Sequence, residues 1–337
     1  MSMEDRRQRL LALLDDENEI APLLLDQPAD IRWLTGLNSS NAVAILSPSH
    51  LVLATDNRYA AQARALDGNF ELVIDSKVRE AAFERFTELV QVAPEPVAQP
   101  EAVARARAIK DDDELVLIRQ ACEISVEGLT NLLPQIRIGL TEVELARMLE
   151  LEMAKLGAED RAFATIVAAG PNSAIPHHAP TSSKLLAGDL LKIDFGARVD
   201  GYNADCTRSF IVGAEPEDWQ LELHAQVLSA SEAAKRAVRP GLIGAELDAV
   251  ARDYLLGQDV ADQFLHGLGH GVGLDIHEYP FLIPNSVDVL EERSVFTIEP
   301  GLYVEGSGGI RIEDTCALID GELVIFTDVD RSLKRVG

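Results

Sequence analysis

Lys192-Ile-Asp-Phe-Gly-Ala-Arg-Val-Asp-Gly-Tyr-Asn-Ala-Asp-Cys-Thr-Arg-Ser-Phe210 is the stretch that decides the fold, because its pattern predicts a β-hairpin. Apolar residues alternate on both sides of the turn dipeptide Asp200-Gly201, as in two paired strands. Asp194 and Asp205 each interrupt a strand pattern where a buried carboxylate would need a partner. If the strands pair across the turn, we expect the two carboxylates to lie side by side. Two such groups repel each other unless they share a proton or bind a cation.

A second hairpin, also interrupted by two acids, is predicted near the C-terminus. Ser294–Tyr303 has the pattern of a strand, and Ile310–Leu318 returns after the glycine-rich turn 306–309. Glu299 and Glu313 interrupt this second pair of strands as the two aspartates interrupt the first. The sequence therefore predicts four carboxylates on two matched hairpins.

A glycine-rich segment with several histidines lies between the hairpins. His266-Gly-Leu-Gly-His-Gly-Val-Gly273 is followed by His277, and its four glycines allow the backbone to approach another group closely. Two Asp, two Glu and one His suit a pair of divalent ions, with Mn²⁺, Co²⁺ or Fe²⁺ favoured over a structural zinc. Two ions about 3.5–4 Å apart can hold a bridging water and polarise a carbonyl, which is metal-assisted hydrolysis. The alternative is that each acid forms an ion pair with an arginine, namely Arg198, Arg208 or Arg311.

Two segments of the chain match each other at an offset of 102 residues. Arg137–Leu145 and Arg239–Leu247 share Arg, Gly, Leu, Glu and Leu in register, and each follows one predicted helix and begins another. This match favours an internal duplication, with two α/β halves that each carry one acidic hairpin. The helices expected in these halves cover about 111–133, 141–157, 216–238 and 244–256.

The first part of the chain alternates between strand and helix patterns, which predicts a small α/β domain. Strands are expected at 21–25, 42–46, 51–54 and 71–74, and helices at 4–15, 57–65 and 79–92. Ala93–Pro100 contains three prolines, cannot hold a helix and is the expected linker. The predicted domains are therefore residues 1–108 and 109–337.

The chain is acidic, with 337 residues and a net charge of −26. This charge argues against nucleic acid and anionic membranes as partners, because phosphate binding needs basic patches. Three scattered cysteines are too few for a disulfide framework or a cysteine-rich zinc site. We find neither a secretory signal nor an apolar run of about 18 residues, and therefore expect a cytoplasmic protein.

The acidic and histidine motifs resemble those of the pita-bread-fold metallopeptidases, specifically the Xaa-Pro aminopeptidase (aminopeptidase P) and prolidase branch. The residues that carry this resemblance are Asp194, Asp205, His270 in Gly-His-Gly-Val-Gly, Glu299 in Thr-Ile-Glu-Pro-Gly, and Glu313 in Arg-Ile-Glu-Asp-Thr. The resemblance extends from Ile109 to the C-terminus, and residues 1–108, with Thr55-Asp-Asn-Arg-Tyr59, resemble a creatinase-type N-terminal domain. It implies an α/β (α+β) architecture in which a pita-bread catalytic domain with a pseudo-twofold duplication follows the smaller domain.

The resemblance also implies a role for each residue of the site. Asp194 would bind one ion, His270 and Glu299 the other, while Asp205 and Glu313 would bridge both. Glu299 would also be the general base and then the general acid for a metal-bridging water or hydroxide that attacks the scissile carbonyl. The residues that would line the substrate site, steady the oxyanion or orient the carboxylates are His177, His266, His277, Tyr303 and Arg311.

The same resemblance implies a cofactor and partners. Two divalent ions per chain are expected, Mn²⁺ first, with Co²⁺, Fe²⁺ or Zn²⁺ as alternatives. The expected substrates are proline-containing peptides, and the expected assembly is a homodimer. His178 and His224 are expected at the surface, without a role.

The motifs favour an Xaa-Pro aminopeptidase over an Xaa-Pro dipeptidase, or prolidase. A dipeptidase must recognise the free carboxylate of Xaa-Pro, ideally with an arginine fork. Prolidases that resemble this chain often carry arginine directly after the His-Glu-aromatic-Pro run, where this chain has Phe281. An arginine from elsewhere could substitute, so the dipeptidase stays the alternative. A methionine aminopeptidase, a creatinase-like hydrolase and a non-catalytic peptide-binding protein of the same fold fit the sequence less well.

Overall fold

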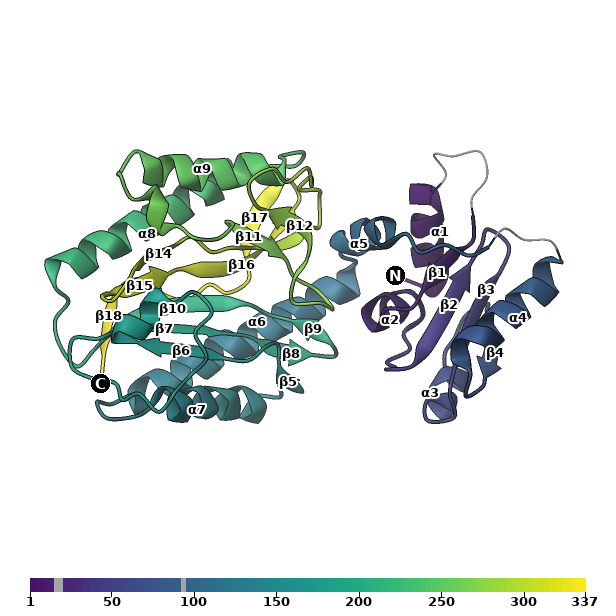
Figure 1. The fold of residues 1–337 in the computed structure, drawn as a ribbon, viewed down its shortest axis with the longest axis horizontal. Coiled ribbons are helices and arrows are strands. Elements are labelled where there is room, and N and C mark those ends of the chain that lie inside the picture. The colour runs from purple at the N-terminus through teal and green to yellow at the C-terminus, as the bar shows by residue number, and fades with distance from the viewer. Residues whose placement is uncertain (15–20, 92–94) are drawn as a thin grey trace. The chain divides into compact units, whose positions relative to one another are not determined.

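The computed structural model describes residues 1–14, 21–91 and 95–337, and these form two compact units, Met1–Arg107 and Ala108–Gly337. Figure 1 shows the ribbon of both units. The units divide one residue before the boundary that the sequence predicts. Ala93 and Pro94 of the predicted linker lie outside the described residues, whereas Val97 within it pairs with Leu23 as an isolated parallel bridge.

The first unit is a four-stranded sheet flanked by helices. The strand order is β1 (Leu23–Leu25), β2 (Ala42–Leu46), β3 (Leu51–Thr55) and β4 (Glu71–Ile74). The helices are α1 (Met3–Leu14), α2 (Pro28–Thr35), α3 (Ala60–Arg64), α4 (Val78–Val90) and α5 (Pro100–Ala108). The sequence did not predict α2 and α5, because each begins at a proline, a residue that breaks helix interiors but suits the first turn. The predicted strands 42–46, 51–54 and 71–74 are confirmed to within one residue.

The helices of the second unit begin where the sequence predicts. They are α6 (Asp112–Leu132), α7 (Glu142–Lys155), α8 (Asp218–Ala237) and α9 (Gly244–Leu256). Asp111 and Thr141 are the N-caps of α6 and α7, and each forms a capping box with the glutamate three residues later. No helix in the described ranges is both long and apolar enough to cross a bilayer.

A mixed sheet forms the centre of the second unit, with the order β12-β11-β13-β16-β10-β7-β6. The strands are β6 (Ile166–Ala169), β7 (Leu190–Phe195), β10 (Cys206–Val212), β11 (Gly269–Gly271), β12 (Glu278–Leu282), β13 (Val295–Ile298) and β16 (Glu313–Ile319), with β17 (Glu322–Ile325) on β16 and β18 (Lys334–Val336) on β10. The short strands β5 (Asp160–Arg161), β8 (Ala197–Val199) and β9 (Tyr202–Asn203) form a separate three-stranded sheet, and β14 (Gly301–Val304) pairs with β15 (Gly308–Arg311). In Figure 1 these strands lie between α6 and α7 on one side and α8 and α9 on the other.

The predicted internal duplication is confirmed in the second unit. Gly139 and Gly241, 102 residues apart, both have a positive φ, +89° and +82°. The N-cap Thr141 forms an isolated bridge with Lys184, and the equivalent N-cap Ile243 forms one with Val289. Each half therefore consists of a helix pair, a bridge that holds the start of the second helix, and one of the two long hairpins. The apolar core is divided in the same way, since one buried cluster contains α6 and α7 residues and the other contains α8 and α9 residues.

Candidate active site

The first hairpin brings its two aspartates to the same face of the sheet but not directly opposite each other. The two-residue turn pairs Val199 with Tyr202, and the same register pairs Asp194 with Thr207. Asp205 lies two residues before Thr207, on the same side of the strand, so it is the diagonal neighbour of Asp194. The expectation that the two carboxylates lie side by side is therefore corrected by this register.

The second hairpin sets its two glutamates opposite each other. Ile298 pairs with Asp314 on one side, and the Ile312 amide donates to the Pro300 carbonyl at 3.3 Å on the other. Glu299 and Glu313 are the pair between these two positions. Because Glu313 also pairs with Thr207 across the two hairpins, one row of side chains crosses the sheet. That row is Asp194, Thr207, Glu313 and Glu299.

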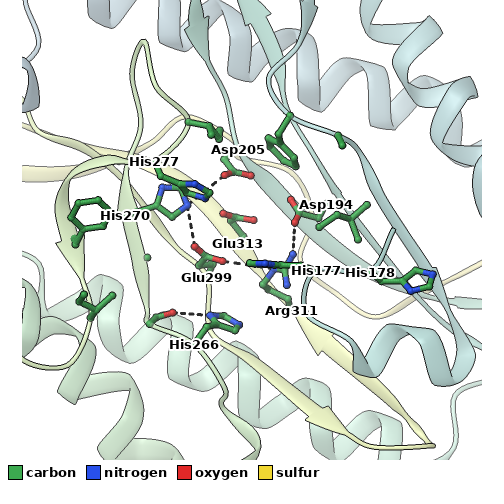
Figure 2. Close-up of a pocket in the computed structure, with 18 of the residues that line it drawn as sticks. His177, His178, Asp194, Asp205, His266, His270, His277, Glu299, Arg311 and Glu313 are labelled. Carbon is green, nitrogen blue, oxygen red and sulfur yellow. Dashed lines mark hydrogen bonds and ion pairs between the residues drawn. The ribbon is translucent and has the colours of Figure 1, made fainter. Parts of the chain in front are cut away.

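His270 joins the carboxylates from the neighbouring strand β11, in the segment that we predicted only as a glycine-rich loop. Its imidazole Nε2 lies 3.3 Å from Glu299 Oε1 and 3.6 Å from Asp205 Oδ2. One ligand atom each of Asp205, His270 and Glu313 lies within 4.8 Å of the others. The close backbone approach at this segment is to the protein itself, since a Cβ on Gly269 would lie 2.1 Å from the Thr297 carbonyl oxygen. Figure 2 shows the four carboxylates and His270 converging on one space.

The charges of this cluster fit divalent cations. Asp194 Oδ1 is buried without a hydrogen-bond partner among the described residues. Burial raises the pKa of Asp205 and Glu313 well above the ordinary range, and neighbouring carboxylates add to this shift. Burial also opposes ionisation of Glu299, but the hydrogen bond and the charge of His270 lower its pKa to about 2. Oxygen-rich ligation with one imidazole suits a divalent ion, and such an ion would offset the excess negative charge.

Arg311 is the buried cation of the site. Its Nη2 donates to Asp194 Oδ2, its Nε donates to Thr207 Oγ1 at 3.0 Å, and its Nη1 donates to the Tyr303 hydroxyl at 2.8 Å. The ion-pair alternative from the sequence thus holds for Asp194 and, with Arg311 Nε 3.9 Å from Glu299 Oε2, also for Glu299. The other two arginines pair elsewhere: Arg208 with Asp314, and Arg198 with Glu159 and Asp160 at the surface.

His266 is the last acceptor in a chain of hydrogen bonds that begins at Arg311. Its Nδ1 lies 2.8 Å from the Gly267 carbonyl, which can only accept, so Nδ1 carries the hydrogen. Burial lowers the pKa of His266, and the neutral ring therefore accepts the Tyr303 hydroxyl hydrogen at Nε2, 2.8 Å away. Tyr303 in turn accepts from Arg311, which connects the three residues in one direction.

His177 and His277 point into a cavity of about 540 Å³ beside the carboxylates. The His277 ring packs edge-on against His270 at 4.3 Å. Burial, followed by the charge of His270, lowers the pKa of His277. The sequence did not identify the apolar wall of this cavity, because its members come from separate elements with ordinary core patterns. The apolar lining residues are Phe163, Ala164, Ile166, Ala179, Pro180, Ile276, Phe281 and Ile283.

Two histidines that we expected at the surface are buried. His178 is 8% exposed and its Nε2 lies 2.8 Å from Glu142 Oε2. His224 is also 8% exposed and its Nε2 lies 2.7 Å from the Arg331 carbonyl. Both expectations were wrong because the partners are distant in the sequence, where no local pattern indicates them.

The fold and the carboxylate–histidine cluster define a metal-dependent hydrolase of the pita-bread type. Residues 116–320 match the model of metallopeptidase family M24, and residues 6–138 match the creatinase/prolidase N-terminal domain. The chain therefore belongs to metallopeptidase family M24, in the branch of the Xaa-Pro peptidases, and its Asp205, His270 and Glu313 could hold a metal ion.

Some relatives of this chain are named Xaa-Pro dipeptidases and others X-Pro aminopeptidases, and members of both groups match nearly its whole length. An Xaa-Pro dipeptidase from Pyrococcus furiosus is 32% identical over 350 residues, which cover 98% of this chain and 100% of the relative. The solved structure of an Xaa-Pro dipeptidase from Bacillus anthracis has a TM-score of 0.89 at 30% identity and covers 99% of this chain and 100% of its own. The solved structure of an X-Pro aminopeptidase from Thermotoga maritima has a TM-score of 0.84 at 34% identity. It covers 98% of this chain and 100% of its own.

Proposed function

We propose that the chain is an Xaa-Pro aminopeptidase, which releases the N-terminal residue from peptides of three or more residues with proline second. Two divalent ions, Mn²⁺ first, would polarise the scissile carbonyl and acidify the attacking water. Asp194, Asp205, His270, Glu299 and Glu313 would hold these ions. A homodimer and a cytoplasmic location stay predictions.

The side chains around the ions have roles that follow from their contacts. Glu299 would accept the proton of the attacking water and deliver it to the leaving nitrogen. His177 and His277 face the cavity and are the candidates for contact with the substrate carbonyl. Arg311 and Tyr303 hold Asp194 and His266, so we assign them to orientation of the site.

The preference for longer peptides rests on one observation about the cavity. Among the described residues that line it, Arg311 is the one arginine or lysine, and its donors already bind Asp194, Thr207 and Tyr303. The free carboxylate of a bound Xaa-Pro dipeptide would therefore find no uncommitted guanidinium. Phe281 and Ile283 line the cavity with apolar surface instead, which suits a continuing peptide chain.

The alternative is an Xaa-Pro dipeptidase. It is favoured by the names of the Pyrococcus furiosus and Bacillus anthracis relatives, and it would require a carboxylate-binding group from outside the cavity lining. A non-catalytic peptide-binding protein is the less favoured third hypothesis.

Parallel assays of the Mn²⁺-loaded protein with Ala-Pro-Ala and Ala-Pro test this proposal, with release of alanine as the measurement. Cleavage of the tripeptide with little cleavage of the dipeptide is expected. Phe281→Arg should raise the rate on Ala-Pro relative to Ala-Pro-Ala, because it adds the missing guanidinium. Val287→Arg is the matched control, since Val287 is 74% exposed and lies outside the cavity lining. Preferential cleavage of Ala-Pro by the unmodified chain would refute the aminopeptidase assignment.

A further inference from the structure

His177 lies in a segment without regular secondary structure, yet it faces the site. The segment runs from the end of the 3-10 helix 170–174 to the start of β7 at Leu190. Backbone of this kind usually has low local stability, because its amides lack a repeating set of partners. A histidine that contacts a substrate needs a fixed position. The contacts on either side of His177 therefore decide whether it can act.

Glu142 binds the chain on both sides of His177. Glu142 is fully buried at the first position of α7. Its Oε1 accepts from the Ala169 amide and the Asn172 side chain, both at 2.9 Å. Its Oε2 accepts from His178 Nε2 at 2.8 Å, and from the Thr181 amide at 2.9 Å and hydroxyl at 2.7 Å. One carboxylate thus accepts five hydrogen bonds, all from residues 169–181.

On the N-terminal side, Lys192 holds the same segment. Lys192 lies on β7, two residues before Asp194, and is fully buried. Its Nζ donates to the carbonyls of Ser173 at 3.1 Å, Ile175 at 2.7 Å and Pro176 at 3.2 Å. Three carbonyls within the four residues before His177 therefore converge on one buried lysine nitrogen.

Burying an ionised group costs several kcal/mol unless its surroundings compensate for the lost water. Here the buried carboxylate of Glu142 and the buried side-chain nitrogen of Lys192 form hydrogen bonds with the same short stretch of chain. We propose that the Glu142–His178 contact, with Lys192 on the other side, fixes His177 in the orientation that the substrate site requires. Glu142, His178 and Lys192 are then positioning residues that act through His177. This inference rests on the proposed peptidase function for its kinetic test, but not for its structural test.

Hydrogen–deuterium exchange of segment 173–181 tests the structural part without any substrate. Glu142→Gln keeps the shape of the side chain but replaces one acceptor oxygen by an amide that donates. We expect faster exchange in this segment and unchanged exchange in Glu144→Gln. Glu144 is the matched control, because it is exposed in the first turn of the same helix and binds only its own cap residue, Thr141. Unchanged exchange in Glu142→Gln would overturn the inference.

A double-mutant cycle with His177→Ala tests the kinetic part on Ala-Pro-Ala. Glu142→Gln should lower kcat by about 10- to 100-fold, as expected for a misplaced group, with a smaller change in KM. Adding Glu142→Gln to His177→Ala should then cost little more, because the two residues act in series. Losses that multiply in the double variant would show general damage and refute the positioning role.

A second pair of variants serves if Glu142→Gln does not fold. His178→Phe removes the ring donor, and His178→Gln retains an N–H that can reach Glu142. We expect the glutamine variant to restore kcat and the slow exchange that the phenylalanine variant loses. Equal values for the two variants would overturn the inference. If the unmodified chain cleaves neither Ala-Pro-Ala nor Ala-Pro, the proposed function fails, and the exchange measurement alone decides on the positioning.

Discussion

Replacing Asp314 by asparagine should destabilise the second unit strongly. Asp314 is fully buried beside the carboxylates and accepts from Arg208 Nη2 at 2.6 Å and from Arg331 Nε at 2.7 Å, with Lys235 as a third cation. Burial favours protonation of Asp314, but these three charges hold its pKa well below the usual range. Asparagine has the same shape, so the substitution isolates the loss of the charge.

The size of the stability loss depends on which of the cations around Asp314 are shielded from water. The Arg208 side chain is 2% exposed, whereas Lys235 and Arg331 are 11% and 21% exposed and can recover some hydration. Leaving one buried charge without its partner costs about 3–5 kcal/mol. The other donors of Arg208 bind carbonyls, including that of Glu313 at 2.5 Å, so the guanidinium stays in place. We therefore expect a loss of about 3–5 kcal/mol in the free energy of unfolding, most of it from Arg208.

Urea unfolding in a Trp33→Phe background measures this loss. Trp219 then remains as the one tryptophan and reports on the second unit alone. Asp328→Asn is the control, because Asp328 pairs with Arg331 at the surface at 75% exposure and should change stability by less than about 0.5 kcal/mol. Since the folded-state pKa of Asp314 is lowered, its contribution is present above about pH 4 and declines only at lower pH. A loss below about 1 kcal/mol at pH 7 would refute the reasoning, because it would mean that the Arg208 charge is compensated without Asp314.

Two further predictions concern the carboxylate site. Mn²⁺ at about 100 times its dissociation constant should raise the free energy of unfolding by about 2.7 kcal/mol. Asp205→Asn should weaken this stabilisation. Thermal unfolding with and without Mn²⁺, in the absence of substrate, measures both effects. A Mn²⁺ effect that persists unchanged in Asp205→Asn would place the ion elsewhere. Gly269→Ala should destabilise by at least about 1–3 kcal/mol through overpacking, because its Cβ would meet the Thr297 carbonyl at 2.1 Å. Gly257→Ala is its control, with a φ of −65° and a nearest contact of 3.4 Å.

The hairpins and their acids could be predicted from the sequence because the signals are local. A turn dipeptide limits where two strands can pair, and an acid in an apolar strand pattern is conspicuous. The exact partners were harder to predict. Asp194 pairs with Thr207 and not with Asp205, because a diagonal and a direct neighbour on one face differ by two residues, and the alternation pattern does not distinguish them.

The contacts of Glu142 and Lys192 that position the His177 segment could not be predicted, because they join residues that are far apart in the chain. In the sequence, Glu142 only lies between the capping residues Thr141 and Glu144, and its contact with His178 spans 36 residues. Lys192 lies within the stretch that decides the fold, but nothing local shows that its side-chain nitrogen binds carbonyls 16 to 19 residues earlier. Such contacts depend on the tertiary fold, whereas motifs and turns depend on neighbours in sequence.

Two threonines help the sheet face to hold the two glutamates before any ion binds. Thr207 separates Asp194 from Glu313, donates to Glu313 Oε2 at 2.6 Å and accepts from Arg311 at 3.0 Å. Thr297 makes a similar pair of hydrogen bonds in the other half, since it donates to Glu299 at 3.1 Å and accepts from the His270 amide at 3.1 Å. A hydroxyl can both donate and accept, so it binds an anionic oxygen and a cationic or amide donor at once. The register that aligns the acids therefore also aligns the hydroxyls that orient Glu313 and Glu299.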